Sequence, residues 1–334
     1  MPVTALLDIQ NLSISVRSGG RELPAVRNAS LSVSAGEVLA IVGESGSGKS
    51  LTALSIIGLL SKGVTQITSG RILFDEQDLA KASPRSLDRY RGSDIGMIFQ
   101  EPLSALNPVL KIGDQIIEGL ISRNTVGRAE ARSLALTALR DVRVSDPERR
   151  LDQYPHELSG GMRQRVMIAL ALISSPKLLI ADEPTTALDV TIQAQVLEVL
   201  RDLQRRRGLA MILITHDLGI VADMADRIAV MYAGEIVETG TVAEILGAPK
   251  HPYTVGLLSC LPEYSPPGRK LVVMPGSIPA LDEHIDGCRF KSRCPQYMPG
   301  ACDKPIPLTA LAGGRACRCV APIGLQEVPA LCLN

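Results

Sequence analysis

Apolar residues follow two patterns along the chain, and each predicts its own kind of element. Apolar and polar residues alternate over 6–16 and over 29–43, where Gly36 breaks the pattern, and this predicts two or three β-strands. After Lys49 the apolar residues take helical spacing, and this helix is expected to end at about 61–63. The chain therefore begins with strands, a Gly-rich loop and a helix.

The middle of the chain predicts helices that alternate with short buried strands. Strands are expected at 94–100, 177–182 and 210–215, and helices at about 111–141 and 161–174. The last two strands are short apolar runs bounded by polar or turn residues, which is typical of buried parallel strands. Alternation of this kind indicates an α/β fold class.

From about His251 the character of the sequence changes. Prolines recur in the segments LPEYSPPG, VVMPGSIPA and CPQYMPGACDKPIP, and they are expected to interrupt any regular element. Six of the seven cysteines lie after Gly287. We therefore expect a separate, irregular appendage at 251–334.

Composition and charge narrow the class of protein. The 334 residues, 46% of them hydrophobic, suffice for two domains, or for one large domain with an appendage, and make disorder improbable. Lys and Arg number 35, as do Asp and Glu, and six Tyr and three Phe are the only aromatic residues apart from His. A neutral chain with so few rings argues against nucleic-acid binding as the main task. The basic triplet 205–207 is expected to be a solvated helix end.

The apolar runs are too short for a membrane helix. The longest, at 166–173 and 209–215, fall well below the roughly 18 to 20 residues that a span requires. The first ten residues also lack the basic flank and apolar core of a secretory signal. We expect a chain that does not itself cross a bilayer and that is cytoplasmic.

A phosphate-binding loop is the most specific motif. The segment GESGSGKS fits the pattern G-x-x-x-x-G-K-[S/T], follows a predicted strand and opens a predicted helix. Its backbone N–H groups would surround a phosphate, Lys49 would reach the β and γ phosphates, and Ser50 would offer a hydroxyl to Mg²⁺. The residues expected to bind ATP here are Gly43, Glu44, Ser45, Gly46, Ser47, Gly48, Lys49 and Ser50.

Polar side chains at two strand ends predict the catalytic groups. The strand at 178–182 ends in Asp182, placed to bind Mg²⁺, and Glu183, placed to polarise an attacking water. His216 follows the next strand, at the sheet edge where ligands collect in open α/β sheets. We expect it to contact the γ-phosphate and to hold the catalytic water.

A second anion site is predicted where LSGGMRQR opens an apolar helix. Here Ser159, Gly160 and Gly161 stand at the start of a helix, and a serine and glycines at a helix start also make up the first loop. One nucleotide cannot need both sites from a single copy of the chain. We therefore expect a head-to-tail dimer in which the loop of one subunit and the SGG of the other clasp the same γ-phosphate.

With these motifs the sequence resembles the nucleotide-binding subunits of ATP-binding cassette (ABC) transporters. The resemblance runs over about 6–249 and adds Gln100 as the Q-loop glutamine and 187–189 as the D-loop, with Asp189 at the nucleotide. It implies a P-loop NTPase cassette with a RecA-like core, an antiparallel β subdomain and an α-helical subdomain at about 101–157. Gln100 would bind Mg²⁺ together with Ser50 and Asp182, and would report its state to the helical subdomain.

Narrower strings resemble the ATPases of dipeptide, oligopeptide and nickel importers. They are FQEPLSALNPV, LSGGMRQRV, DEPTTALDVTIQAQ and HPYTVGLLSC. This resemblance implies a cassette at 1–250 with a peptide-importer extension at 251–334. It also implies ATP hydrolysis that powers uptake through two membrane permeases, with a second identical or homologous ATPase and an extracytoplasmic binding protein. The chain would lie at the cytoplasmic face of the inner membrane, without nucleic acid as a partner.

Other functions compete with this interpretation. A soluble ABC ATPase of DNA repair or translation would need a long coiled-coil insertion or two cassettes in one chain, and neither is visible. An exporter subunit is opposed by HPYTVGLL and by the cysteine-bearing end. Import of nickel chelates in place of peptides stays open, because other subunits choose the ligand.

Two departures from the general cassette pattern concern the nucleotide. Met162 stands where the general signature has Gln, although Met is usual in the peptide-importer branch. The aromatic residue that stacks on adenine in many cassettes should fall near Val16, and no aromatic precedes Phe74. Base specificity is therefore expected to be loose.

Four cysteines in the last segment predict a metal centre. The gaps between Cys288, Cys294, Cys302 and Cys319 are five, seven and sixteen residues, wider than is typical of structural zinc sites. A cytoplasmic location disfavours disulfides. In the peptide-importer family this pattern resembles the ligand set of a [4Fe–4S] cluster, so the resemblance implies such a cluster on these four thiolates.

Alternatives for the cysteines stay open. They are a zinc ion or plain reduced thiols in place of the cluster. Cys317 is an alternative fourth ligand, and Cys260 and Cys332 are expected to take no part.

Overall fold

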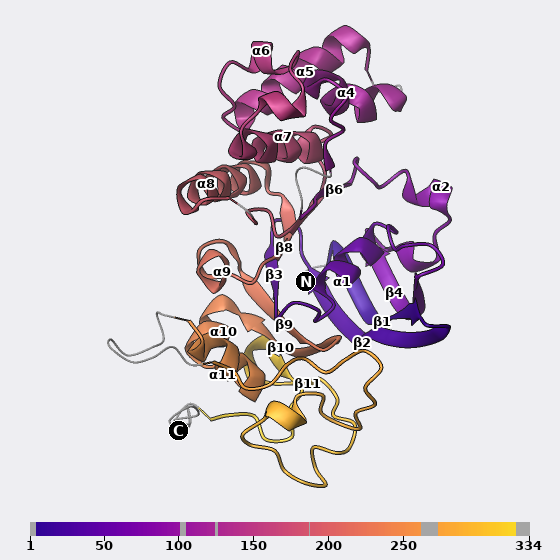
Figure 1. The fold of residues 1–334 in the computed structure, drawn as a ribbon, viewed down its shortest axis with the longest axis vertical. Helices are drawn as coiled ribbons and strands as arrows, with labels where there is room; N and C mark the ends of the chain where they lie inside the picture. The colour runs from indigo at the N-terminus through magenta and orange to yellow at the C-terminus, as the bar shows by residue number, and fades with distance from the viewer. Residues whose placement is uncertain (1–4, 101–104, 124–125, 187, 262–272, 325–334) are drawn as a thin grey trace. The chain divides into compact units, whose positions relative to one another are not determined.

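The computed structural model describes residues 5–100, 105–123, 126–186, 188–261 and 273–324. Its contacts divide the chain into two units. The first consists mainly of Lys81–Ile214, and the second joins Leu7–Ser32 and Leu39–Ala80 to the residues from Thr215 onward. Each unit is described by itself (Figure 1).

Parallel strands form the sheet of the first unit. They are β6 (Ile95–Ile98), β7 (Leu178–Asp182) and β8 (Ala210–Ile214), with β7 paired to both neighbours. Every residue of β7 and β8 is buried. Continuous burial matches strands covered on both faces, so the prediction of buried parallel strands is confirmed.

Helices of the first unit pack around α7 (Gly160–Leu172), where α4 (Ile112–Ser122), α5 (Arg128–Asp141) and α7 contact one another. Buried residues of α4 recur at helical spacing, as Ile112, Ile116, Ile117 and Leu120 show. The other helices of this unit are α2 (Pro84–Leu87), α6 (Pro147–Arg150) and α8 (Val190–Arg207), with a 3₁₀ turn at Pro155–Glu157. A further 3₁₀ turn, at Leu79–Lys81, begins in the second unit and ends in the first.

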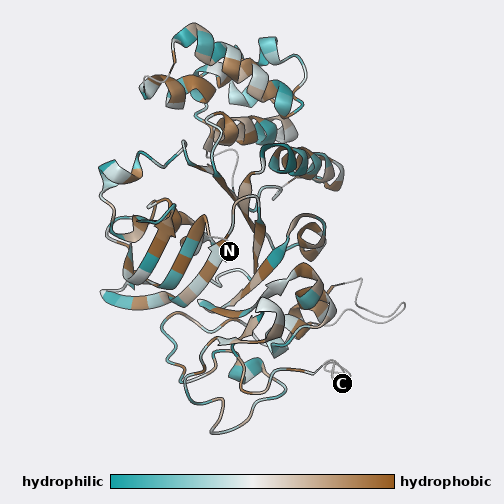
Figure 2. Cartoon of the chain, turned by 180° about the vertical axis from the view of Figure 1, so that it is seen from behind, coloured by the Kyte–Doolittle hydropathy of each residue, from teal (hydrophilic) through white to brown (hydrophobic). Residues whose placement is uncertain are grey.

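An antiparallel sheet of the second unit has the strand order β2-β1-β4-β5. Its strands are β1 (Leu7–Ser18), β2 (Arg21–Val33), β4 (Thr65–Phe74) and β5 (Gln77–Asp78). Leu7, Ile9, Leu12 and Ile14 of β1 are fully buried, whereas the residues between them are partly or fully exposed, and Figure 2 shows the same banding in colour. The alternating pattern at the start of the sequence therefore predicted these strands correctly.

The other strands of this unit belong to a mixed sheet, and one of them ends at the phosphate-binding loop. There β3 (Val38–Val42) runs parallel to β9 (Arg227–Tyr232), which pairs antiparallel with β10 (Glu235–Thr241). Two short strands from the end of the chain, β12 (Ala316–Cys317) and β11 (Thr309–Ala310), extend this sheet beyond β10. The cysteine-bearing segment is thus hydrogen-bonded to the strand system that supports the loop.

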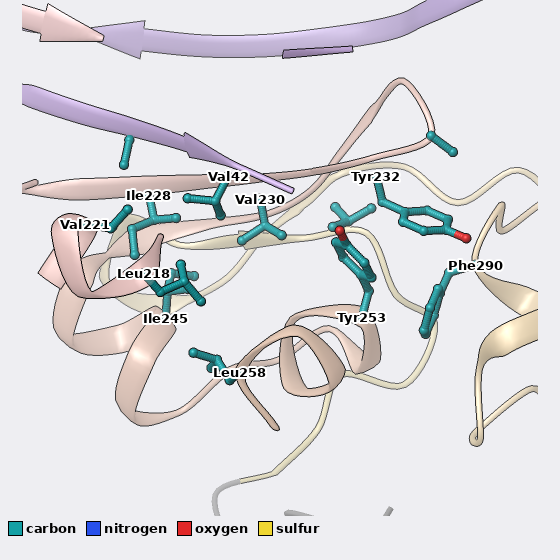
Figure 3. Packing of buried hydrophobic residues seen from close by; sticks show 13 residues of the cluster. Val42, Leu218, Val221, Ile228, Val230, Tyr232, Ile245, Tyr253, Leu258 and Phe290 are labelled. Carbon is teal, nitrogen blue, oxygen red and sulfur yellow. The ribbon is translucent and has the colours of Figure 1, made fainter. Parts of the chain in front are cut away.

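A buried cluster joins this sheet to the helices beside it. Val42, Val230 and Tyr232 from the strands pack with Tyr253 and Phe290, as Figure 3 shows. Full burial of such side chains contributes about 1.5 to 3 kcal/mol each. The helices of this unit are α1 (Lys49–Ile56), α9 (Leu218–Met224), α10 (Val242–Gly247) and α11 (Pro252–Ser259), with 3₁₀ turns at Lys291–Arg293 and Ala312–Gly314.

Two predictions about helices are wrong in detail. The helix after Lys49 ends at Ile56, before 61–63, because Gly58 takes a left-handed conformation with φ 62° just beyond the helix cap. The expectation of no regular element after His251 fails at α11. Proline is tolerated in the first helical turn, and Pro252 opens the helix there while the His251 ring accepts a hydrogen bond from the Tyr253 N–H.

Within the described ranges, none of the helices combines the length and the apolar character that crossing a membrane requires.

Candidate nucleotide-binding site

The loop after β3 has a backbone that glycine makes possible. Gly43, Gly46 and Gly48 have φ values of 153°, 81° and 104°. A Cβ atom at Gly43 would lie 2.1 Å from the carbonyl oxygen of Met231, so no other residue fits there without a backbone shift. Helix α1 begins directly after Gly48. The predicted order of strand, Gly-rich loop and helix is confirmed.

Lys49 lies buried against this loop. Its Nζ donates hydrogen bonds to the carbonyl oxygens of Gly43, at 2.8 Å, and Glu44, at 3.0 Å. Only 6% of the residue is exposed. An ammonium group and a helix N-terminus therefore occur together at one loop, which is the combination that favours phosphate.

Asp182 and Glu183 stand at the end of β7. Asp182 is 4% exposed. Glu183 has a left-handed backbone with φ 47°, and its N–H donates to the carbonyl oxygen of Ile214 at 2.9 Å. A non-glycine residue in this conformation costs about 1 to 3 kcal/mol, a strain that is concentrated at functional sites.

Gln100 and Glu183 are brought together by the register of the sheet. Ile98 of β6 lies opposite Ala181 of β7, so the residues that follow the two strands leave the sheet side by side. Gln100 Nε2 donates to Glu183 Oε2 at 3.0 Å. Two residues predicted for catalysis are therefore in direct contact.

Thr186 is a residue that the sequence patterns did not single out. Its Oγ1 donates to the same Glu183 Oε2 at 2.9 Å. Threonine three positions after a carboxylate is too common to serve as a signal, so only the turn after β7 reveals this contact.

The SGG segment and Asp189 lie at helix starts. Ser159 caps α7 by accepting from the Met162 N–H at 3.4 Å, and Asp189 caps α8 by accepting from the Ile192 N–H at 3.0 Å. A Cβ atom at Gly161 would lie 2.5 Å from Ile192 Cγ2. These helix starts are accordingly fixed by capping and by close packing. Ala187 of the predicted D-loop lies outside the described residues.

His216 belongs to the second unit, as does the phosphate-binding loop. It is exposed, follows β8 in the chain and precedes Asp217, which caps α9 by accepting from the N–H groups of Gly219 and Ile220. Gln100, Asp182, Glu183, Asp189 and the SGG segment belong to the first unit.

One cavity gathers the four predicted cysteine ligands. Cys288, Cys294, Cys302 and Cys319 all line it. Cys317 is not among the lining residues and lies on β12 opposite Glu238. This arrangement favours Cys319 over Cys317 as the fourth member of the set.

Burial favours the protonated form of three of these thiols. It raises the pKa of Cys288 to about 12 and that of Cys294 to about 11, and it also raises the pKa of Cys319. In the part of the chain that the structure describes, no three His, Cys, Asp or Glu side chains come together closely enough to hold a metal ion. The four thiols therefore share a cavity, but within the described residues they do not form a preformed ion site.

Comparison with known proteins decides the family. A family model described as "ABC transporter" matches residues 26–186, and one described as "Oligopeptide/dipeptide transporter, C-terminal region" matches residues 237–302. The dipeptide transport ATP-binding protein DppD of Bacillus subtilis is 50% identical over 302 residues, which cover 90% of each chain. The chain belongs to the ATP-binding proteins of oligopeptide and dipeptide ABC transporters.

Other similar proteins agree with membership of this ABC family. The oligopeptide transport ATP-binding protein OppD of Bacillus subtilis is 50% identical over 292 residues, or 87% of this chain and 82% of that one. A solved structure titled as a dimeric post-hydrolysis state of the ATP-binding cassette MJ0796, bound to ADP and Pi, matches with a TM-score of 0.63 and 30% identity. It covers 71% of this chain and 98% of that one. The P-loop NTPase cassette fold predicted from the sequence is thereby confirmed.

Proposed function

We propose that this protein hydrolyses ATP to power the uptake of dipeptides or oligopeptides through an ABC importer. The observation that carries the proposal is the match of both the cassette and the C-terminal region to transporters of these peptides. Identity of 50% to a dipeptide transport protein over 90% of the chain supports the same substrate class.

The phosphate-binding loop is proposed to bind the ATP phosphates. Backbone N–H groups of 43–50 and the ammonium of Lys49 would surround the β and γ phosphates. The Lys49 side chain is buried, and its Nζ donates hydrogen bonds to two carbonyl oxygens of the loop, so the amine is restricted to this loop. Ser50, Gln100 and Asp182 would hold Mg²⁺, which neutralises phosphate charge when bound.

Glu183 is proposed as the group that polarises the attacking water. Its contacts with Gln100 and Thr186 fix one carboxylate oxygen, which supports a defined orientation of the base. His216 is proposed to contact the γ-phosphate and to hold this water. Together these groups would orient water for in-line attack on the γ-phosphorus.

Two cassettes are proposed to form each pair of ATP sites. Ser159, Gly160, Gly161 and Asp189 of one subunit would complete the site on the loop of another, which is either identical or homologous. The dimeric cassette among the similar solved structures supports this arrangement. We further propose that the dimer docks on two permeases at the cytoplasmic face of the inner membrane through residues 101–157, and that a binding protein delivers the ligand.

A [4Fe–4S] cluster is proposed on Cys288, Cys294, Cys302 and Cys319. The cavity that the four thiols share supports this proposal. Four cysteine thiolates are the usual ligands of a [4Fe–4S] cluster, and the wide gaps between these cysteines are not typical of structural zinc sites. When bound, it would give the proline-rich segment 251–334 a rigid centre.

Native purification and uptake assays test the proposal. The protein, affinity-purified from its own cells in mild detergent, should bring down two membrane permeases and a second cassette. Uptake of a labelled dipeptide should fail in a strain with Lys49→Ala, and uptake of nickel should be unaffected. Recovery of ribosomes or DNA in place of permeases, or loss of nickel uptake alone, would refute peptide import.

A further inference from the structure

We propose that Arg293, from the cysteine-rich segment, is a positioning residue for the phosphate-binding loop: it neutralises and holds Glu44, and thereby sets the affinity of the loop for MgATP. This inference rests on the proposed role of residues 43–50 in binding the ATP phosphates. It assigns the C-terminal segment a part in nucleotide binding.

The contact between the two residues is direct. Arg293 Nη1 lies 3.1 Å from Glu44 Oε2. The Arg293 side chain is 5% exposed and that of Glu44 is 30% exposed. An ion pair so well shielded from water is far less screened than a surface pair, so its loss changes the local field strongly.

Several further contacts fix the guanidinium group. Arg293 Nε donates to the carbonyl oxygen of Pro275 at 2.8 Å, and its central carbon lies 5.7 Å from the ring centre of Tyr232 and 5.8 Å from that of Phe290. These distances fall within the range of cation–π attraction. These contacts hold the guanidinium in one orientation, independently of its ion pair with Glu44.

The aromatic cluster of Tyr232, Tyr253 and Phe290 also contacts the backbone of the phosphate-binding loop. The N–H of Glu44 donates to Tyr253 Oη at 2.9 Å. The ring centroids of Tyr253 and Tyr232 are 4.6 Å apart, and Phe290 meets both rings edge-on (Figure 3). Glu44 is thus held at its backbone by Tyr253 and at its carboxylate by Arg293, and both contacts come from the chain after residue 250.

Charge makes the pair relevant to a phosphate ligand. The guanidinium of Arg293 does not lose its proton in a protein, and it lies against the Glu44 carboxylate at 3.1 Å. Within the described residues Glu44 Oε1 is buried without a hydrogen-bond partner. Without Arg293, an uncompensated carboxylate would lie in the loop and would repel the phosphate oxygens of ATP.

Charge variants test the inference by their opposite effects. We expect Arg293→Met to weaken MgATP binding about tenfold, which is within the usual range for two coupled sites. Glu44→Gln removes the negative charge from the loop and should bind MgATP more tightly than the unchanged protein. The double variant E44Q/R293M should regain most of the lost affinity, because the repelling charge is gone. Binding is measured by titration calorimetry or with a fluorescent ATP analogue.

A matched control separates positioning from general loosening of the segment. Lys291→Met breaks the ion pair between Lys291 Nζ and Asp303 Oδ1, 2.7 Å long, in the same stretch of chain. Within the described residues Lys291 has no contact with the phosphate-binding loop, so this variant should leave the affinity for MgATP unchanged. Arg293→Lys keeps the positive charge and should retain more affinity than Arg293→Met.

Three outcomes would overturn the inference. They are equal affinities of Arg293→Met and Lys291→Met, a double variant as weak as Arg293→Met, and a Glu44→Gln variant that binds tenfold more weakly than the unchanged protein. The last comparison holds even if Arg293→Met fails to fold. Lys49→Ala distinguishes the two proposals, since unaltered MgATP binding in that variant would refute the role of the loop itself.

Discussion

The side-chain amide of Gln100 donates a hydrogen bond of 3.0 Å to the carboxylate of Glu183, although 82 residues separate them in the chain. The parallel register of β6 and β7 makes this contact, because it places the two strand ends beside each other. Gln100, which is expected to sense the nucleotide, is therefore hydrogen-bonded to Glu183, the expected catalytic base. A displacement of either side chain must change the position of the other.

Glu183→Gln should leave MgATP binding intact and abolish turnover. An amide cannot take a proton from water, so kcat should fall by about 10² to 10⁴. Because ATP would then persist in the closed dimer, light scattering should detect dimers that MgATP stabilises. Rapid turnover by this variant would show that another residue is the base.

Thr186→Val should lower kcat with little change in KM. It removes a hydrogen bond to Glu183 Oε2, and a hydrogen bond to a charged group is worth about 1.5 to 3 kcal/mol. The expected loss in kcat is about tenfold or more. Thr186→Ser keeps the hydroxyl and should restore most of the rate; a serine variant as slow as the valine variant would contradict this role.

Gly161→Ala should lower the free energy of unfolding by about 1 to 3 kcal/mol, because a Cβ there would meet Ile192 Cγ2 at 2.5 Å. Gly160→Ala is the matched control, since its nearest neighbour, Leu188 Cδ2, would lie at 3.8 Å. Urea unfolding of both variants measures the difference. Ile192→Ala should relieve the overlap, so Gly161→Ala should cost less free energy of unfolding when it is added to Ile192→Ala than when it is made alone. An equal or larger cost in the Ile192→Ala protein would argue against the overlap.

Cys302→Ser should abolish iron binding, whereas Cys317→Ser should retain it. Cys302 lines the shared cavity and Cys317 does not. Iron, sulfide and the visible spectrum are measured after anaerobic purification. A colourless unchanged protein with stoichiometric zinc would exclude the cluster, and iron loss in Cys317→Ser alone would make Cys317 the ligand.

The sequence predicted best where local pattern and local chemistry coincide. The alternation in β1 and the apolar runs of β7 and β8 each encode burial directly, and the glycines of 43–50 encode a backbone that other residues cannot adopt. The end of α1 was missed because Gly58 stops a helix whose apolar pattern continues.

Contacts between distant segments could not be read from the pattern. Arg293 is one arginine among many, and nothing near it indicates a partner in the loop at Glu44. Tyr253 was visible only as part of the string HPYTVGLL, without a role. Tertiary packing alone decides which of these side chains meet.

The pair of Glu44 and Arg293 has a consequence for the synthesis of the protein. The two residues are 249 positions apart, so a growing chain exposes its phosphate-binding loop long before the arginine leaves the ribosome. During that interval the loop carries an unmatched negative charge. A chain that is cut short before Arg293 would keep every cassette motif and still lack a loop fit to hold ATP tightly, and incomplete products would therefore compete poorly for the nucleotide.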